Sequence, residues 1–170
     1  MKKNEIIEIF TNIKEEPELR KEFLSLLIKF LDLRSNPFHP LVFINGKPKI
    51  GKNVYVGLFS EVNAKGSEVI IGDNCDIASF VSINVADSHR LCLGLEDKIG
   101  RKPIIIEHNV FIGSHSFIGG GTHIGHHSVI GAGTILINAG HISPYSLIIG
   151  NPAKIKEGYF KQEYEKNNIT

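Results

Sequence analysis

The first candidate for proton transfer in this sequence is His89, in the segment ADSHRL. An imidazole has an ordinary pKa of about 6.5, so at neutral pH it can accept the proton of a hydroxyl group during nucleophilic attack. Asp87 precedes His89 by two residues. Its carboxylate suits a hydrogen bond to the other imidazole nitrogen, and it equally suits an ordinary Asx turn. From position alone, His89 is either a general base or a surface histidine on a loop.

The segment around His89 interrupts an otherwise regular sequence. Residues 84–105 read NVADSHRLCLGLEDKIGRKPII and contain several charges, two glycines and a proline. A loop of this length inside a compact domain costs conformational entropy, and such loops are usually functional or disordered. We therefore expect the chemistry of the protein at this excursion from the regular pattern.

Residues 106–153 repeat every six positions. The hexads are IEHNVF, IGSHSF, IGGGTH, IGHHSV, IGAGTI, LINAGH, ISPYSL and IIGNPA. No α-helix has this period, and a small residue in each unit suits a corner, so the pattern predicts a parallel β-helix with three hexads per coil. Residues eighteen apart then stack at a spacing of about 4.8 Å. Two inward ladders are expected, Ile106, Ile124 and Ile142, and Ile112, Ile130 and Ile148.

The rest of the chain flanks this repeat. Earlier hexads begin at Ile50, and residues 4–34 place apolar side chains at helical spacing on both sides of Pro17, which predicts a pair of α-helices. These helices either cover the open first coil or help to bind an acceptor. We predict three parts: a helical cap at 1–36, a β-helix at 37–153 with the excursion at 84–105, and a tail at 154–170 that is expected to be helical.

The hexads, together with the segments IGAGTI at Gly131 and GNPAK at Gly150, resemble the hexapeptide-repeat acyltransferases. The resemblance is closest to the sugar and xenobiotic O-acetyltransferase branch and spans about residues 48–158. It implies a mainly β fold, a left-handed parallel β-helix that departs from the usual right-handed crossover. It also implies a homotrimer that uses acetyl-CoA as co-substrate.

In this family an excursion from the coil carries the catalytic histidine, and His89 is the matching residue. The resemblance implies that His89 is the general base while an acceptor hydroxyl attacks the thioester of acetyl-CoA directly. No Cys or Ser–His pair suited to an acyl-enzyme is apparent. Asn84 stands where relatives hold the acceptor, and we assign Asp87 to the same acceptor side. Glu96 and Asp97 are further candidates for contacts with acceptor hydroxyls, with no preference between them.

The donor is expected in a groove between coils of adjacent subunits. Ser114 and Ala132 are eighteen residues apart and therefore share a corner, and the family's matching backbone amides contact the reactive end and pantetheine arm of CoA. Asn151 and Lys154 of the GNPAK segment match positions near the nucleotide, where Lys154 or Lys156 can meet a phosphate. Three small residues keep this wall open to the ligand, Gly113, Gly131 and Gly133.

One segment departs from the family pattern. Relatives commonly have a Thr-Lys pair after the GAG hexad, and that lysine often contacts the donor. This chain has Ile137 and Asn138 there, and the segment that follows is two residues longer than usual. We therefore expect the nucleotide end of CoA to be held differently in this protein.

The eight histidines of the sequence require a test for a metal centre. The gamma-type carbonic anhydrases resemble this chain in fold and hold zinc with three histidines, two of which are five residues apart. No pair with that spacing occurs among the histidines after the excursion, which are His108, His115, His123, His126, His127 and His141. Because zinc needs at least three converging protein ligands, we expect no metal cofactor.

Composition argues against several other classes of protein. The net charge is +1 and charged residues make up 22% of the chain, so no basic field favours nucleic acid or an anionic membrane. No apolar run reaches the roughly 18 residues of a spanning helix, and the start MKKNEIIEIF lacks the features of a signal peptide. We expect a cytoplasmic protein that neither binds nucleic acid nor inserts into a membrane.

These observations and the resemblance together predict an acetyl-CoA-dependent acetyltransferase that modifies a hydroxyl of a sugar or a nucleotide-linked sugar. A hydroxyl acceptor is favoured because it is the poorer nucleophile and needs the base most. N-acetylation of an amino-sugar nucleotide is the close alternative. Two alternatives belong to other classes, a non-catalytic β-helix assembly module and a gamma-type metal hydratase. The His89 segment counts against the first, and the histidine spacing counts against the second.

Overall fold

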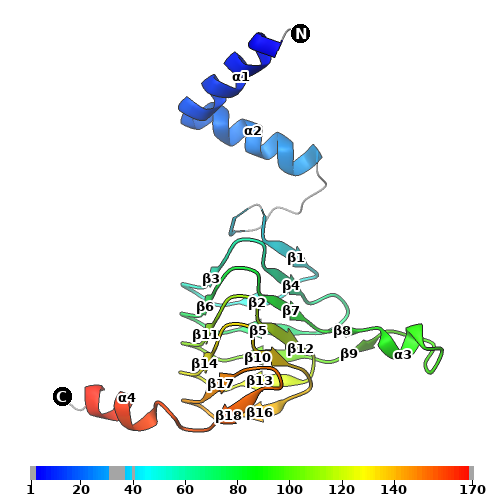
Figure 1. Ribbon diagram of the computed structural model, residues 1–170, viewed down its shortest axis with the longest axis vertical. Coiled ribbons are helices and arrows are strands. Elements are labelled where there is room, and N and C mark those ends of the chain that lie inside the picture. Colours follow the sequence, from blue (N-terminus) through cyan, green and yellow to red (C-terminus); the bar gives the residue numbers. More distant parts are fainter. Residues whose placement is uncertain (1–2, 31–36, 40, 169–170) are drawn as a thin grey trace. The chain divides into compact units, whose positions relative to one another are not determined.

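Figure 1 shows the computed structural model of the chain, which describes residues 3–30, 37–39 and 41–168. The chain divides into two compact units, residues 1–35 and residues 36–170. In the described residues the smaller unit is helical, and the larger unit is a coil of short strands with a helical tail.

The smaller unit contains α1 (Lys3–Glu15) and α2 (Pro17–Phe30). Pro17 is the first residue of α2, where its missing N–H removes no helical hydrogen bond. The rings of Phe10 and Phe23 meet edge to face with their centroids 5.6 Å apart, so the two helices contact each other. The predicted pair of α-helices is confirmed. The predicted continuation of the second helix as far as residue 34 lies outside the described residues.

The larger unit winds through three parallel sheets. Sheet A contains β1 (Phe43–Asn45), β4 (Glu61–Asn63), β7 (Ser82–Asn84), β12 (Phe117–Gly119) and β15 (Ile135–Leu136). Sheet B contains β2 (Lys49–Ile50), β5 (Val69–Ile71), β10 (Ile104–Ile106), β13 (Thr122–Ile124) and β16 (Gly140–Ile142). Sheet C contains β3 (Tyr55–Val56), β6 (Asp76–Ile77), β11 (Phe111–Ile112), β14 (Val129–Ile130) and β17 (Leu147–Ile149). Each turn of the coil adds one strand to each sheet, and the predicted left-handed parallel β-helix is confirmed.

The core of the coil consists of inward ladders of aliphatic side chains. Two of these ladders have the predicted members, Ile106, Ile124 and Ile142, and Ile112, Ile130 and Ile148. All six side chains are at most 1% exposed. Burying each one stabilises the fold by roughly 1.5–3 kcal/mol relative to leaving it in water, so the ladders alone supply a large core without a second layer.

The hexads turn at three corners, which we call AB, BC and CA after the sheets that they join. Several corner residues have left-handed backbone conformations. At the BC corner these include Asn53, Asn74 and Asn109, with φ between 54° and 56°. Asparagine tolerates this conformation better than most residues, which explains its recurrence there. At the CA corner the same backbone geometry is adopted by Phe59 and Phe80, which carry their rings outward.

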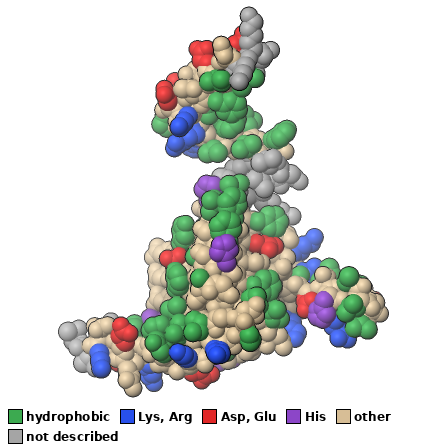
Figure 2. All heavy atoms as spheres, in the orientation of Figure 1, with side chains coloured by type: hydrophobic (Ala, Val, Ile, Leu, Met, Phe, Trp, Pro, Cys, Tyr) green, Lys and Arg blue, Asp and Glu red, His purple; other side chains and the backbone are tan. Residues whose placement is uncertain are grey.

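The excursion leaves the coil at the AB corner, between β7 and β10. β8 (Ala86–Asp87) pairs antiparallel with β9 (Gly100–Arg101), and the one-turn helix α3 (His89–Cys92) follows β8. Figure 2 shows this part of the chain as a protruding lobe on which basic, acidic, histidine and hydrophobic side chains are exposed. The two-stranded stem fixes the direction in which the lobe leaves the coil.

The tail begins as a strand. β18 (Lys154–Lys156) pairs antiparallel with β17 and covers the edge of sheet C, and only then does α4 (Lys161–Asn168) form. A helical tail was expected from residue 154. The backbone groups at the edge of β17 instead take up a further strand, which protects that edge. No helix of the described residues, α4 included, has the length and apolar character needed to cross a membrane.

Candidate active site

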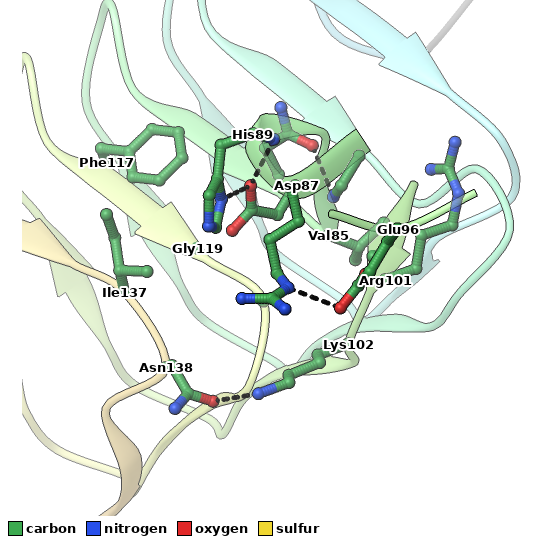
Figure 3. Close-up of a pocket in the computed structure, with 15 residues that line it drawn as sticks. Val85, Asp87, His89, Glu96, Arg101, Lys102, Phe117, Gly119, Ile137 and Asn138 are labelled. Atoms are coloured by element: carbon green, nitrogen blue, oxygen red, sulfur yellow. Dashed lines mark hydrogen bonds and ion pairs between the residues drawn. The ribbon is translucent and has the colours of Figure 1, made fainter. Parts of the chain in front are cut away.

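His89 and Asp87 form a hydrogen-bonded pair where β8 gives way to α3 (Figure 3). His89 Nδ1 lies 2.5 Å from Asp87 Oδ1, and the backbone N–H of His89 donates to the same oxygen at 3.2 Å. The two interpretations of Asp87 from the sequence, an imidazole partner and an Asx turn, therefore hold together. Because Nδ1 faces a carboxylate, the neutral ring carries its proton there, and Nε2 has the lone pair that can accept a proton.

The pKa of Asp87 lies below its ordinary value. The hydrogen bond from the His89 side chain is the main cause, followed by the bond from the His89 backbone N–H, and the positive charge of Lys102 adds a smaller effect. Both members of the pair are open to solvent in the single chain, with 64% of the His89 side chain and 54% of the Asp87 side chain exposed. Asp87 is thus ionised at neutral pH and fixes both the tautomer and the orientation of the imidazole.

The pair lines a cavity of about 610 Å³ at the AB corner. Asn84, which the sequence assigns to the acceptor, also lines this cavity and is partly buried. Its Oδ1 accepts hydrogen bonds from Asn63 Nδ2 at 3.1 Å and from the backbone N–H of Ala86 at 2.8 Å. The Nδ2 amide of Asn84 is therefore the group through which this residue can meet a ligand.

Glu96 and Asp97, the two further acceptor candidates, differ in position. Glu96 lines the cavity and accepts a charged hydrogen bond from Arg90 Nε at 2.5 Å. Asp97 is not among the described residues that line it. Of the two carboxylates, only that of Glu96 is placed to meet a ligand in this cavity, and Arg90 already partly neutralises it.

Two cationic side chains of the cavity were not singled out from the sequence, Arg101 and Lys102. Arg101 Nη1 donates to the carbonyl oxygen of Lys65 at 2.5 Å, and Lys102 Nζ donates to Asn138 Oδ1 at 2.8 Å. Within the described part of the chain, neither forms an ion pair with a carboxylate. The cavity wall therefore carries two cations outside any ion pair, although the ionised Asp87 lines the same cavity and interacts with Lys102 at longer range. Arg101 and Lys102 are adjacent in the sequence, but their hydrogen-bond partners, Lys65 and Asn138, are each 36 residues away along the chain, so the sequence did not indicate these contacts.

The wall opposite the excursion includes Ile137 and Asn138 (Figure 3), the pair at which the sequence departs from the family pattern. The Ile137 side chain is 62% exposed, and Asn138 holds Lys102 as described above. The departure thus coincides with a change in the cavity itself, where an apolar side chain and an amide face the His89 side.

The residues assigned to the acyl donor gather at the CA corner. Ser114 and Ala132 lie in consecutive coils, and the carbonyl oxygen of Ser114 accepts the backbone N–H of Gly133 at 2.9 Å. A Cβ atom on Gly113 would lie only 2.5 Å from the backbone nitrogen of Ala132, so glycine allows these two coils to approach. Ala132 is exposed, and its backbone is accessible to a ligand.

Asn151 and Lys154 extend the same region. Gly150 stands eighteen residues after Ala132, and its carbonyl oxygen accepts the backbone N–H of Ile135 at 3.3 Å. Asn151 follows it directly, and Lys154 begins β18 opposite Ile149. Both side chains are exposed beside the CA corner.

One chain does not bring the two groups of predicted residues together. His89 belongs to the AB corner, Ser114 belongs to the CA corner, and the strands of sheet A run between these corners. The backbone at Ser114 and the imidazole of His89 therefore lie at opposite ends of the strands of sheet A within a single chain.

Side chains that suit a metal ion occur elsewhere in the coil, in two groups: Glu107, His123 and His141, and His108, His126 and His127. The sequence test missed them because it looked for a spacing of five, whereas the coil stacks residues eighteen apart. The expectation that the protein holds no metal stays a prediction.

The family model for the hexapeptide repeat of succinyl-transferase matches residues 49–84 and 103–137. The chain is a hexapeptide-repeat protein. The two matched segments end on either side of the excursion, so the repeats carry the family pattern and the His89 segment is inserted between them. No protein of curated function matches this hexapeptide-repeat protein in sequence.

Solved structures similar to this hexapeptide-repeat protein include acyltransferases. The N-acyltransferase AntD from Bacillus cereus, solved with dTDP and 3-hydroxybutyryl-CoA, has a TM-score of 0.61 and 17% identity over 76% of each chain. A maltose O-acetyltransferase from Clostridium difficile 630 has a TM-score of 0.57 and 24% identity over 84% of this chain and 76% of its own. The polySia-specific acetyltransferase NeuO has a TM-score of 0.56 and 29% identity over 68% of this chain and 60% of its own. At their identities the first two likenesses concern the fold alone.

Proposed function

We propose that this protein transfers an acetyl group from acetyl-CoA to a hydroxyl of a sugar or a nucleotide-linked sugar, with His89 as the general base. The observation that carries the proposal is the His89–Asp87 pair, which lines a cavity on a coil of the acyltransferase type. A cavity of about 610 Å³ has the size of an ordinary small-molecule site.

The proposed chemistry follows from the tautomer that Asp87 selects. His89 Nε2 takes the proton of the acceptor hydroxyl as its oxygen attacks the thioester carbonyl, and the ionised Asp87 stabilises the imidazolium that forms. The tetrahedral intermediate then collapses with cleavage of its C–S bond. The departing CoA sulfur takes the proton from His89, so the enzyme returns to its starting state and no acyl-enzyme forms.

The separation of His89 from Ser114 within one chain supports a homotrimer with shared sites. We place the donor along the CA corner of one subunit, against the backbone at Ser114 and Ala132, and the excursion of a neighbouring subunit beside it. Exposed apolar side chains on the excursion are consistent with this packing, since Leu93 is 68% exposed and Leu95 is 60% exposed in the single chain. In this arrangement Asn151 and Lys154 lie toward the nucleotide end of CoA.

The charge of the cavity supports an acceptor that carries a phosphate. Arg101 and Lys102 line the cavity without a carboxylate partner among the described residues. Arg101 is partly buried and Lys102 is exposed; two cations on one cavity wall favour an anionic ligand, and a nucleotide-linked sugar supplies one in its diphosphate. Asn84 and Glu96 then remain for the sugar hydroxyls.

The decisive experiment combines acetyl-CoA with a panel of neutral sugars, nucleotide-linked sugars and amino-sugar nucleotides. Free thiol is measured by colorimetry, and acetylated products are identified by mass spectrometry. His89→Ala should lower turnover by roughly 10²–10⁴ with a hydroxyl acceptor, the factor expected for a lost general base. Lys98→Ala is the matched control, because Lys98 lies on the same exposed excursion and does not line the cavity.

Each rival function has its own result in this experiment. Thiol release confined to amine acceptors, with little effect of His89→Ala, would favour N-acetylation. Failure of every acceptor, together with no heat of CoA binding in calorimetry, would exclude the transferase and favour the assembly module. Hydration of carbon dioxide by the zinc-loaded protein would favour the metal hydratase.

A further inference from the structure

The BC corner holds a cluster of three histidines that the proposed reaction does not use. His108 and His126 stand eighteen residues apart in consecutive coils, and their rings stack with centroids 4.8 Å apart and planes 22° from parallel. His127 meets both rings edge to face, at 5.0 Å from His126 and 5.4 Å from His108. One ligand atom from each of the three lies within 4.8 Å of the other two.

The fold does not require histidine at these places. The left-handed position of this corner is held by Asn53, Asn74 and Asn109 in earlier coils, and His127 takes it with a φ of 55°. A histidine there alone would be an ordinary corner residue. His108 and His126 have no positive φ, so the backbone geometry of the corner gives no reason for the other two imidazoles.

The hydrogen bonds of the cluster are unevenly shared. His126 Nδ1 and His127 Nδ1 face each other at 2.9 Å, and Asn109 Nδ2 lies 2.9 Å from His127 Nε2. Two imidazole nitrogens at this distance share a proton in a hydrogen bond. The His108 imidazole, which is exposed, stacks on its neighbours but forms no hydrogen bond with another described residue. When His126 and His127 share a proton, the His108 imidazole therefore has no polar partner among the described residues.

The surroundings of His127 favour its neutral form. The pKa of His127 is lowered, first by its burial and then by repulsion from His126 and His108 when they are charged. The carboxylate of Glu107 fixes the backbone beside them, because its Oε2 accepts the N–H of His126 at 2.9 Å. A neutral imidazole is the form that binds a metal.

The neighbouring group of Glu107, His123 and His141 is a weaker candidate. Glu107 Oε1 is already paired with His123 Nε2 at 2.8 Å, and its other oxygen holds the backbone of His126. A metal ion at this group would have to displace the hydrogen bond between Glu107 and His123. Glu107 instead holds the backbone of His126 beside the histidine cluster.

We propose that His108, His126 and His127 bind one divalent transition-metal ion with a preference for imidazole, such as Zn²⁺ or Ni²⁺. Three histidines with a water molecule in the fourth position form a common zinc coordination set. Bond lengths near 2.1 Å place the ligand nitrogens about 3.4 Å from one another, so metal binding requires small shifts of the rings, in which His126 Nδ1 and His127 Nδ1 move apart from 2.9 Å. Asn109 turns its amide so that Oδ1 accepts the N–H of His127 Nε2, as the outer partner of a ligating histidine does.

The ion has a structural role in this proposal. It links His108 of one coil to His126 and His127 of the next, at the corner that carries neither the excursion nor the donor residues. The ring of Tyr164 in α4 meets His127 edge to face at a centroid distance of 4.5 Å, so a shift of His127 on metal binding also affects the contact with the C-terminal helix. The proposal does not rest on the acetyltransferase activity, and either one stands if the other fails.

The test is calorimetric titration of Zn²⁺ into the full chain, purified without a polyhistidine tag and stripped of metal with a chelator. The wild-type protein should bind one ion per chain. His108→Ala should weaken binding by about 100-fold or more, and Asn109→Ala by about 10–100-fold. His115→Ala is the matched control, because it removes an equally exposed histidine at the CA corner and should leave the affinity unchanged.

Two results would overturn the proposal. Equal Zn²⁺ affinity in the wild-type protein and His108→Ala would show that the cluster is not the site. Loss of binding in His141→Ala with full binding in His108→Ala would assign the ion to the Glu107 group. Far-ultraviolet circular dichroism of each metal-free variant shows that it is folded, and a rise in melting temperature on adding Zn²⁺, absent in His108→Ala, provides the independent readout.

Discussion

A single oxygen of Asp87 holds both the imidazole and the backbone of His89. Asp87 Oδ1 lies 2.5 Å from His89 Nδ1 and accepts the backbone N–H of His89 at 3.2 Å. The arrangement arises because β8 ends at Asp87 and α3 begins at His89, which leaves Ser88 alone to make the turn. The carboxylate thus fixes the side chain relative to its own main chain, and the position of Nε2 follows.

Asp87→Asn should reduce turnover by roughly 10–100-fold, less than His89→Ala, because the base is present but its tautomer is no longer selected. The Michaelis constant for acetyl-CoA should be unchanged, which separates a positioning role from a binding role. Melting temperature at neutral pH should stay within about a degree of the wild type, because an exposed pair contributes little to stability.

The pH dependence of the Asp87 contribution follows from its lowered pKa. A depressed folded-state pKa gives a contribution that is present above the unfolded value of about 3.9 and is lost as the pH falls through the folded value. The ratio of wild-type to Asp87→Asn turnover should therefore be constant at every pH at which His89 is neutral in both proteins. A ratio that still changed with pH in that range would contradict the role given to the carboxylate.

Lys102→Met should raise the Michaelis constant for a nucleotide-linked acceptor by about tenfold, because a charged hydrogen bond to phosphate is worth about 1.5–3 kcal/mol. The same variant should handle a neutral sugar as the wild type does. Lys98→Met controls for the loss of a positive charge on the excursion. Equal effects of Lys102→Met on both classes of acceptor would remove the argument for a phosphate.

Ala132→Phe should raise the Michaelis constant for acetyl-CoA by roughly tenfold or more, which corresponds to about 1.4 kcal/mol, because the ring fills the space that the donor needs at the CA corner. Ala132 is exposed, so the larger side chain does not disturb the core. Ser114→Ala should have little effect, since the donor is placed against the backbone at that residue. A strong effect of Ser114→Ala would mean that the hydroxyl itself takes part.

Co-expression of the His89→Ala and Ala132→Phe chains tests the shared site. If His89 comes from one subunit and the donor corner from the next, random assembly of equal amounts leaves about one site in four intact in both parts. Activity at low acetyl-CoA should then recover to about a quarter of the wild-type value. Mixing the two purified variants without subunit exchange is the control. No recovery in co-expressed assemblies would place both halves in one chain.

The sequence by itself determined the coil, because a hexad that buries its first residue and turns at small residues can stack only on copies of itself. The six-residue period predicts the ladder from Ile106 to Ile142 and the shared corner of Ser114 and Ala132. It also marks the segment around His89 as an interruption. The contact between Asp87 and His89 could also be anticipated from the sequence, because the two residues are only two positions apart.

The tertiary structure alone decided which residues meet where the six-residue repeat is interrupted. Lys102 reaches Asn138 because the β8–β9 stem aims the end of the excursion at β15, and a hexad pattern does not specify the direction of a stem. Asn74 precedes Asn109 in the BC column by 35 residues, since the excursion lies between them. The histidine cluster and the separation of His89 from Ser114 likewise depend on which corner each residue occupies, and that is a property of the wound coil.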